Sequence, residues 1–178
     1  MKRNFKNSLQ FFQRFLGLNF DCKEQIEEEK KFITYPIIEL ENKKVGMEVM
    51  CRGEKIVMTP EQVLATFLKR AKTYFEKAEM MSKEIVIAVP SYASNTERQA
   101  WLDAAEIAGI KCIRLLNEST AICYNYGFFR KADLSEKDAR TVAFVDFGHS
   151  KLTVTFAKFW QGKMNILFTK SDRNMGAR

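Results

Sequence analysis

The residues best suited to chemistry lie in one short stretch, from Phe144 to Lys151. An apolar strand there runs into Asp146, the chain turns at Gly148, and a second alternating strand follows. Backbone N–H groups in such a turn can form a concave anion site, and an adjacent aspartate can hold magnesium through water. The stretch therefore predicts a phosphate site with a metal ion, although a plain β-hairpin shares the same pattern.

Length and composition indicate a globular chain with one domain or two small lobes. Its 178 residues are 46% hydrophobic and 29% charged, enough to bury a core. No apolar run approaches the roughly 18 residues that span a membrane, and no signal-peptide pattern is present. The cysteines are widely spaced, which predicts neither a zinc site nor a disulfide framework and favours a reducing, intracellular compartment: Cys22, Cys51, Cys112 and Cys123.

The net charge of +7 could favour nucleic acid or an acidic membrane. However, the basic residues are scattered, the acidic run from Glu24 to Glu29 interrupts them, and no aromatic residues interleave with them. We therefore expect no DNA and no membrane partner. A basic, non-enzymatic interaction or RNA-binding module stays open as an alternative.

The first half of the chain predicts two helices around a meander of strands. Apolar spacing indicates a helix from Phe5 to Leu16, and residues 32–58 alternate as strands with turns at 41–44 and 52–54. Thr59 and Gln62 form a capping box for a helix that starts at Pro60. Its apolar side chains are expected in the core, including the aromatic residues Phe67, Tyr74 and Phe75.

The second half predicts a parallel βαβ unit followed by a meander. Residues 85–89 and 110–116 read as strands buried on both faces, joined by a helix with a Ser94/Glu97 capping box. Asn117 is expected to cap a third helix. Residues 141–168 predict three strands, and the charged stretch 130–140 is the candidate boundary between two lobes.

Several motifs together carry a family resemblance. The chain resembles the nucleotide-binding domain of the heat shock protein 70 superfamily through Val89-Pro90-Ser91-Tyr92, Leu102 to Ala105, Ile113 to Ala121, and Tyr126-Gly127. Asp146 to Ser150 lacks the glycine run of classical members and is similar to the heat shock protein 110 branch. Met175 to Arg178 resembles the family's Gly-Gly-Arg segment, so the motifs cover nearly the whole chain.

This resemblance implies a partial α/β ATPase fold of the actin-like, hexokinase-like (ribonuclease H-like) type. Residues 1–130 would belong to the first lobe, 131–140 to a connection, and 141–178 to the start of the second lobe. Because Asp146-Phe147-Gly148 is the single Asp-x-Gly, the family's first phosphate loop has no counterpart and the chain reads as a fragment. We expect it not to hydrolyse ATP alone, since one phosphate loop is too few to align nucleotide and water.

The resemblance also assigns site residues for ATP or ADP with magnesium. Asp146 corresponds to the aspartate that approaches magnesium through water, and Glu118 to the acidic residue near the attacking water. The second phosphate loop would be Gly148, His149, Ser150 and Lys151. Two residues depart from classical members: Lys151 stands in place of a threonine, and Ser119 replaces the proline after the glutamate.

The function implied is that of a fragment of a 110-type chaperone. In the complete protein it would act as nucleotide-exchange factor and holdase, with a classical heat shock protein 70 as partner and unfolded polypeptides bound through other domains. A cytoplasmic, or also nuclear, location would follow. A fragment of an ATP-hydrolysing classical chaperone is one alternative, and a sugar-kinase relative of the same fold is another.

Overall fold

The computed structural model describes residues 7–77 and 84–178, which form two compact units. Of the described residues, the first unit contains 7–77, 84–85 and 94–113, and the second contains 86–93 and 114–178. No helix in these described ranges is long and apolar enough to cross a membrane. The lobe boundaries that the family resemblance implies remain a prediction.

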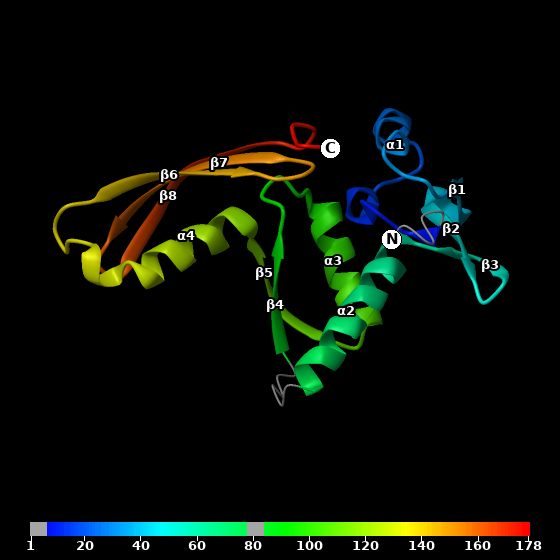
Figure 1. Cartoon of the computed structure of the whole chain (residues 1–178), viewed down its shortest axis with the longest axis horizontal. Coiled ribbons are helices and arrows are strands. Elements are labelled where there is room, and N and C mark those ends of the chain that lie inside the picture. Colours follow the sequence, from blue (N-terminus) through cyan, green and yellow to red (C-terminus); the bar gives the residue numbers. More distant parts are fainter. Residues whose placement is uncertain (1–6, 78–83) are drawn as a thin grey trace. The chain divides into compact units, whose positions relative to one another are not determined.

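The first unit combines a small antiparallel sheet with helices (Figure 1). Its strands are neighbours in the order β1-β2-β3, as the alternation predicted. Helices α2 and α3 pack against each other, and the core includes Phe15, Leu16, Met47, Leu64 and Ala104. The elements are α1 (Lys23–Lys30), β1 (Ile37–Glu39), β2 (Val45–Cys51), β3 (Glu54–Met58), α2 (Pro60–Lys77) and α3 (Asn95–Ile107).

The helix predicted from Phe5 to Leu16 is wrong for the part that the structure describes; Phe5 itself lies outside it. Between Ser8 and Leu16 the chain forms a 3₁₀ turn at Phe12–Phe15, after Phe11 with φ of 57°. Phe12, Arg14 and Phe15 are all buried, so the apolar spacing reflects a turn enclosed on several sides rather than one helical face. The acidic run from Glu24 to Glu29 lies in α1, which buries Ile26 and Glu29.

A buried ion pair ties this turn to α1. The Arg14 Nε and Nη2 atoms donate to Glu29 Oε1 at 2.8 and 2.5 Å, and the two residues are only 5% and 2% exposed. A charge buried at this depth needs its partner, because removing one partner leaves the other charge unpaired and out of water. The pair therefore fixes how the first residues of the unit lie on α1.

We predict that Glu29→Gln lowers the free energy of unfolding of the first unit by about 3 kcal/mol, since it strands the Arg14 charge. Glu27→Gln on the same helix is the matched control, because Glu27 is exposed and its ion pair with Lys30 joins adjacent helix turns. Urea unfolding of both variants measures the difference. Equal losses would show that the buried pair has no special role.

The predicted start of helix α2 is confirmed, but the predicted burial of its aromatic side chains is not. The Thr59 N–H donates to Gln62 Oε1 at 2.9 Å, and the Gln62 N–H donates to Thr59 Oγ1 at 3.3 Å, which completes the capping box. Buried residues occur only in its first turns. The core assignment of Phe67, Tyr74 and Phe75 is wrong, because these side chains are 63%, 57% and 52% exposed.

The strand–helix–strand order is confirmed, but the burial of its strands is not. Strands β4 (Glu84–Val89) and β5 (Lys111–Asn117) are neighbours in a two-stranded sheet, with α3 between them in the chain. The capping box of Ser94 and Glu97 is present. Val86 and Ile113 are more than half exposed, so neither strand is buried on both faces. In the described part of the chain, β4 and β5 pair with each other in a sheet of two strands, and so small a sheet leaves side chains open to water.

The second unit is a helix on an antiparallel three-stranded sheet (Figure 1). The sheet confirms the predicted meander, with β6 (Arg140–Phe147), β7 (Leu152–Trp160) and β8 (Lys163–Asp172). Helix α4 (Glu118–Phe129) packs on β7 and β8, although Asn117 makes no side-chain capping bond, contrary to expectation. A shared core holds them together: Cys123, Leu134, Ala157 and Phe159.

Candidate phosphate-binding site

The stretch around Asp146 forms a hairpin, as both interpretations of its sequence require. Phe147 pairs with Leu152 at the end of β6 and β7, and residues 148–151 make the loop between them. The Gly148 N–H donates to the Lys151 carbonyl oxygen at 2.9 Å. This first amide therefore closes the turn, and an anion would have to be bound by the amides that follow it.

The segment after β8 runs beside this loop and holds it. Asp172 Oδ1 accepts hydrogen bonds from the Asn174 and Met175 N–H groups at 2.8 and 3.1 Å, which turns the chain back. The Ala177 N–H then donates to the Gly148 carbonyl at 3.2 Å, and the Arg178 N–H to the His149 carbonyl at 2.8 Å. The loop carbonyls are thus bound from outside the hairpin.

Gly176 allows this close approach. A Cβ atom on Gly176 would lie 2.4 Å from the His149 carbonyl oxygen, closer than real Cβ atoms come, whereas a Cβ on Gly148 would meet only the Lys151 carbonyl at 3.7 Å. Gly148 is also absent from the glycines with positive φ in the described ranges. The steric need for glycine at this loop therefore falls on the neighbouring segment, not on the turn itself.

Lys151 and Glu118 come together across the hairpin and the start of α4. The Lys151 Nζ forms an ion pair with Glu118 Oε2, and the Lys151 side chain is only 16% exposed. Burial lowers the pKa of the Lys151 ammonium, and the Glu118 carboxylate offsets that penalty on the charge. The residue predicted to lie near an attacking water is thus bound to a cation.

The Tyr92 ring contacts both Lys151 and a second cation, Arg173. The Lys151 Nζ lies 6.0 Å from the centroid of the Tyr92 ring, and the Arg173 guanidinium carbon lies 5.4 Å from it. Cations at this distance are attracted to the ring face. Arg173 was not predicted from the sequence, and its only signal is its position directly after β8, three residues before Gly176.

Ser119 has a structural use that a proline could not serve. Ser91 Oγ donates to Ser119 Oγ at 2.7 Å, and the Ser119 N–H points back to Ser91 Oγ at 3.4 Å. A proline has neither the hydroxyl nor the N–H. This departure from the classical pattern therefore joins the segment after β4 to the first turn of α4, beside Glu118.

Asp146 lies one residue before the end of β6, half-buried and opposite Thr153 on β7. Within the described ranges no side-chain hydrogen bond or ion pair joins it to Glu118 or Lys151, and no three acidic, histidine or cysteine side chains gather as a metal site. A magnesium ion held through water needs only one such carboxylate. The outer-shell role of Asp146 remains a prediction.

Comparison with known proteins identifies the family. A family model described as "Hsp70 protein" matches residues 1–178. The chain belongs to the Hsp70 family. It is 39% identical to the 97 kDa heat shock protein of Strongylocentrotus purpuratus, 36% to a heat shock protein homolog of Eremothecium gossypii, and 38% to the heat shock 70 kDa protein 4 of Homo sapiens, in each case over 98% of this chain.

These relatives confirm the resemblance to the superfamily and to its 110 branch. Membership in the Hsp70 family implies an actin-like ATPase fold, and the mixed helices and sheets of the chain agree with it. The chain spans 20% to 25% of the length of the three relatives.

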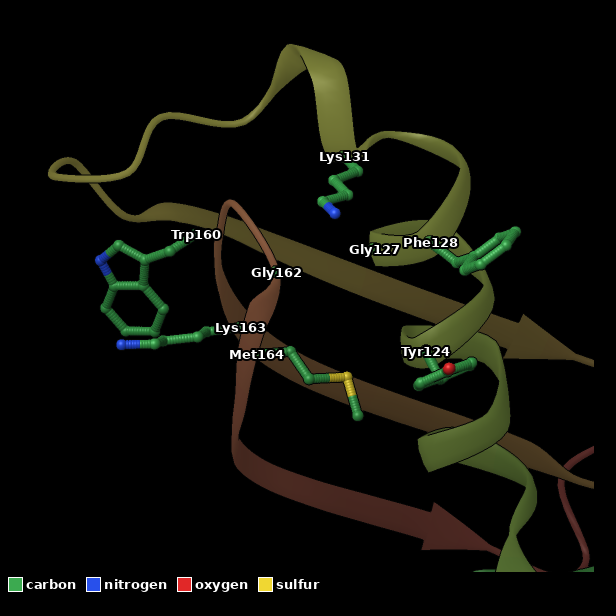
Figure 2. Close-up of a pocket in the computed structure, with 8 residues that line it drawn as sticks. All are labelled: Tyr124, Gly127, Phe128, Lys131, Trp160, Gly162, Lys163 and Met164. Atoms are coloured by element: carbon green, nitrogen blue, oxygen red, sulfur yellow. The ribbon is translucent and has the colours of Figure 1, made fainter.

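The same unit of this Hsp70-family chain has a hollow of about 250 Å³ at the C-terminal half of α4 (Figure 2). The Lys131 and Met164 side chains extend into the space between the helix and the strands, while Trp160 and Lys163 lie together at its other side (Figure 2). None of the predicted phosphate-site residues lines it. The lining residues are Tyr124, Gly127, Phe128, Lys131, Trp160, Gly162, Lys163 and Met164.

We predict that Gly176→Ala lowers the free energy of unfolding of the second unit by about 2 kcal/mol, because the new Cβ would overlap the His149 carbonyl. The amides of Ala177 and Arg178 should then exchange with solvent much faster. Gly148→Ala is the control and should lose far less, since its Cβ meets only an ordinary contact. Chemical denaturation and amide exchange measure both, and equal effects would refute the role of Gly176.

Proposed function

We propose that this chain is the phosphate-binding part of the nucleotide-binding domain of a 110-type chaperone. The observation that supports it best is the hairpin loop at residues 148–151. Its Gly148 and His149 carbonyls are held by the Ala177 and Arg178 amides, while Lys151 and Arg173 lie over Tyr92. Carbonyl groups are thereby engaged away from a ligand, and positive charge gathers at the loop. Both features favour a polyphosphate anion.

In this proposal the ligand is ATP or ADP with magnesium. The amides of His149 and Ser150 would bind phosphate oxygens, and Asp146 would orient the water shell of magnesium, which supplies positive charge to the phosphates. Glu118 is engaged by Lys151, so it is poorly placed to act on a water molecule. This arrangement favours binding over hydrolysis, and therefore a nucleotide-exchange factor and holdase over an ATP-hydrolysing classical chaperone.

The wider assignments rest on the relatives, of which this chain spans at most about a quarter. We propose that residues 1–130 belong to a first lobe and 141–178 to the start of a second, joined by residues 131–140. The partners would be a classical heat shock protein 70 and unfolded polypeptides. The complete protein would work in the cytoplasm, also in the nucleus, as part of the stress response.

A chimaera tests this function. This chain would replace the matching segment of the Eremothecium gossypii heat shock protein homolog. The alignment of the two proteins covers 98% of this chain. We expect the chimaera to bind ATP and to accelerate ADP release from a classical heat shock protein 70. Equilibrium titration and stopped-flow release of labelled ADP measure the two activities, with the unaltered homolog as reference.

The Asp146→Asn chimaera is the internal control. It should bind ATP more weakly chiefly when magnesium is present, because the lost charge acts through the water shell of the metal. A folded chimaera that binds no ATP, or that binds ATP and leaves ADP release unchanged, would contradict the proposal. The isolated chain should bind ATP only with millimolar affinity, a free energy of about −4 kcal/mol, since it has one phosphate loop.

A further inference from the structure

The backbone of Lys151 lies in the proposed phosphate loop, while its side chain reaches Glu118. Its carbonyl accepts the Gly148 N–H at 2.9 Å, which fixes the residue in the turn. Its ammonium ends at the Glu118 carboxylate, and its side chain is 16% exposed. This positive charge is therefore held in one place by the fold, unlike a surface lysine that moves freely in water.

The groups around the Lys151 ammonium also hold its charge in position. Tyr92 offers a ring face to Lys151 and to Arg173. The Glu118 carboxylate forms an ion pair with Lys151, and the Arg173 guanidinium brings a second positive charge to the same ring. The Lys151 side chain is only partly exposed to water, and a positive charge so placed attracts an anion more strongly than the same charge at the surface.

We propose that Lys151 is a built-in cation of the phosphate loop, which occupies Glu118 and replaces much of the charge that a divalent metal ion would supply to bound phosphates. The inference rests on the proposed phosphate-binding function of the loop. An incoming polyphosphate shares or takes the Lys151 ammonium from Glu118. Binding then depends little on magnesium, and the Glu118 carboxylate competes with the ligand.

The probe is inorganic tripolyphosphate, titrated into the full chain at constant ionic strength with magnesium or with EDTA. The chemical shifts of the His149 and Ser150 amides report binding at the loop. We expect the unaltered chain to bind with affinities that agree within about threefold in the two conditions. Loss of the ammonium should weaken metal-free binding about tenfold, the usual effect of losing a hydrogen bond to a charged group.

Lys151→Met removes the charge and keeps a long apolar side chain in the same space, so it tests the ammonium with little change in packing. Lys151→Thr is a second variant that suits the start of a strand. Lys158→Thr on β7 is the matched control, because it removes one charge from the same strand at a distance from the loop. Glu118→Gln should bind tripolyphosphate about tenfold more tightly, since the competing carboxylate is gone.

Each outcome bears on a different claim. The inference is supported if metal-free binding weakens in both Lys151 variants, is unchanged in Lys158→Thr and strengthens in Glu118→Gln. The inference is overturned if the unaltered chain binds tripolyphosphate only with magnesium, or if the Lys151 variants bind it as well as the Lys158→Thr control does. Either result would leave the phosphate-binding function in place. Failure of every variant to bind in either condition would overturn the function as well.

Discussion

The packing of helix α4 on the β6–β8 sheet is the contact on which the candidate site depends. Tyr126 on the helix lies 5.0 Å from Phe159 and 5.4 Å from Phe144, measured between ring centroids. Gly127 lets the backbone approach the Phe159 ring closely. Because α4 begins at Glu118, these aromatic contacts in its second half decide where the carboxylate lies and allow Lys151 to reach it.

Charge is buried in two different ways in this chain. Arg14 and Glu29 are almost fully enclosed in the first unit and bound at hydrogen-bond distance, as a purely structural pair requires. Glu118, by contrast, leaves 34% of its side chain exposed beside Lys151. Water and ligands can reach such a pair, so it can exchange partners at a low free-energy penalty. The degree of enclosure thus separates a structural ion pair from one suited to a binding site.

The sequence predicted the features that neighbouring residues determine. Two capping boxes, the meander at 141–168 and the hairpin at Gly148 each depend on contacts within a few positions, and all are present. Tertiary contacts explain the failures. The 3₁₀ turn at Phe12–Phe15 follows from enclosure by segments that are distant in the sequence. Phe67 and the other aromatic residues of this face of α2 remain exposed, since no described part of the first unit covers them.

The same distinction applies to the site. The family motifs indicated Glu118 and the loop, but the ion pair joins residues that are 33 positions apart, and periodicity carries no information about such a contact. The role of Arg173 was missed for this reason, since its contact with Tyr92 spans most of the second unit in sequence. Ser119 was noticed as a departure, and only the contact with Ser91 explains it.

The hydrogen bonds from Ala177 and Arg178 to the loop carbonyls also affect biosynthesis. A ribosome completes residues 148–151 well before it adds residues 176–178, and the emerging hairpin therefore lacks these donors for a time. β8 must leave the exit tunnel and pair with β7 before the segment can reach the loop. The loop at residues 148–151 should consequently be among the last parts of this unit to reach its final shape during translation.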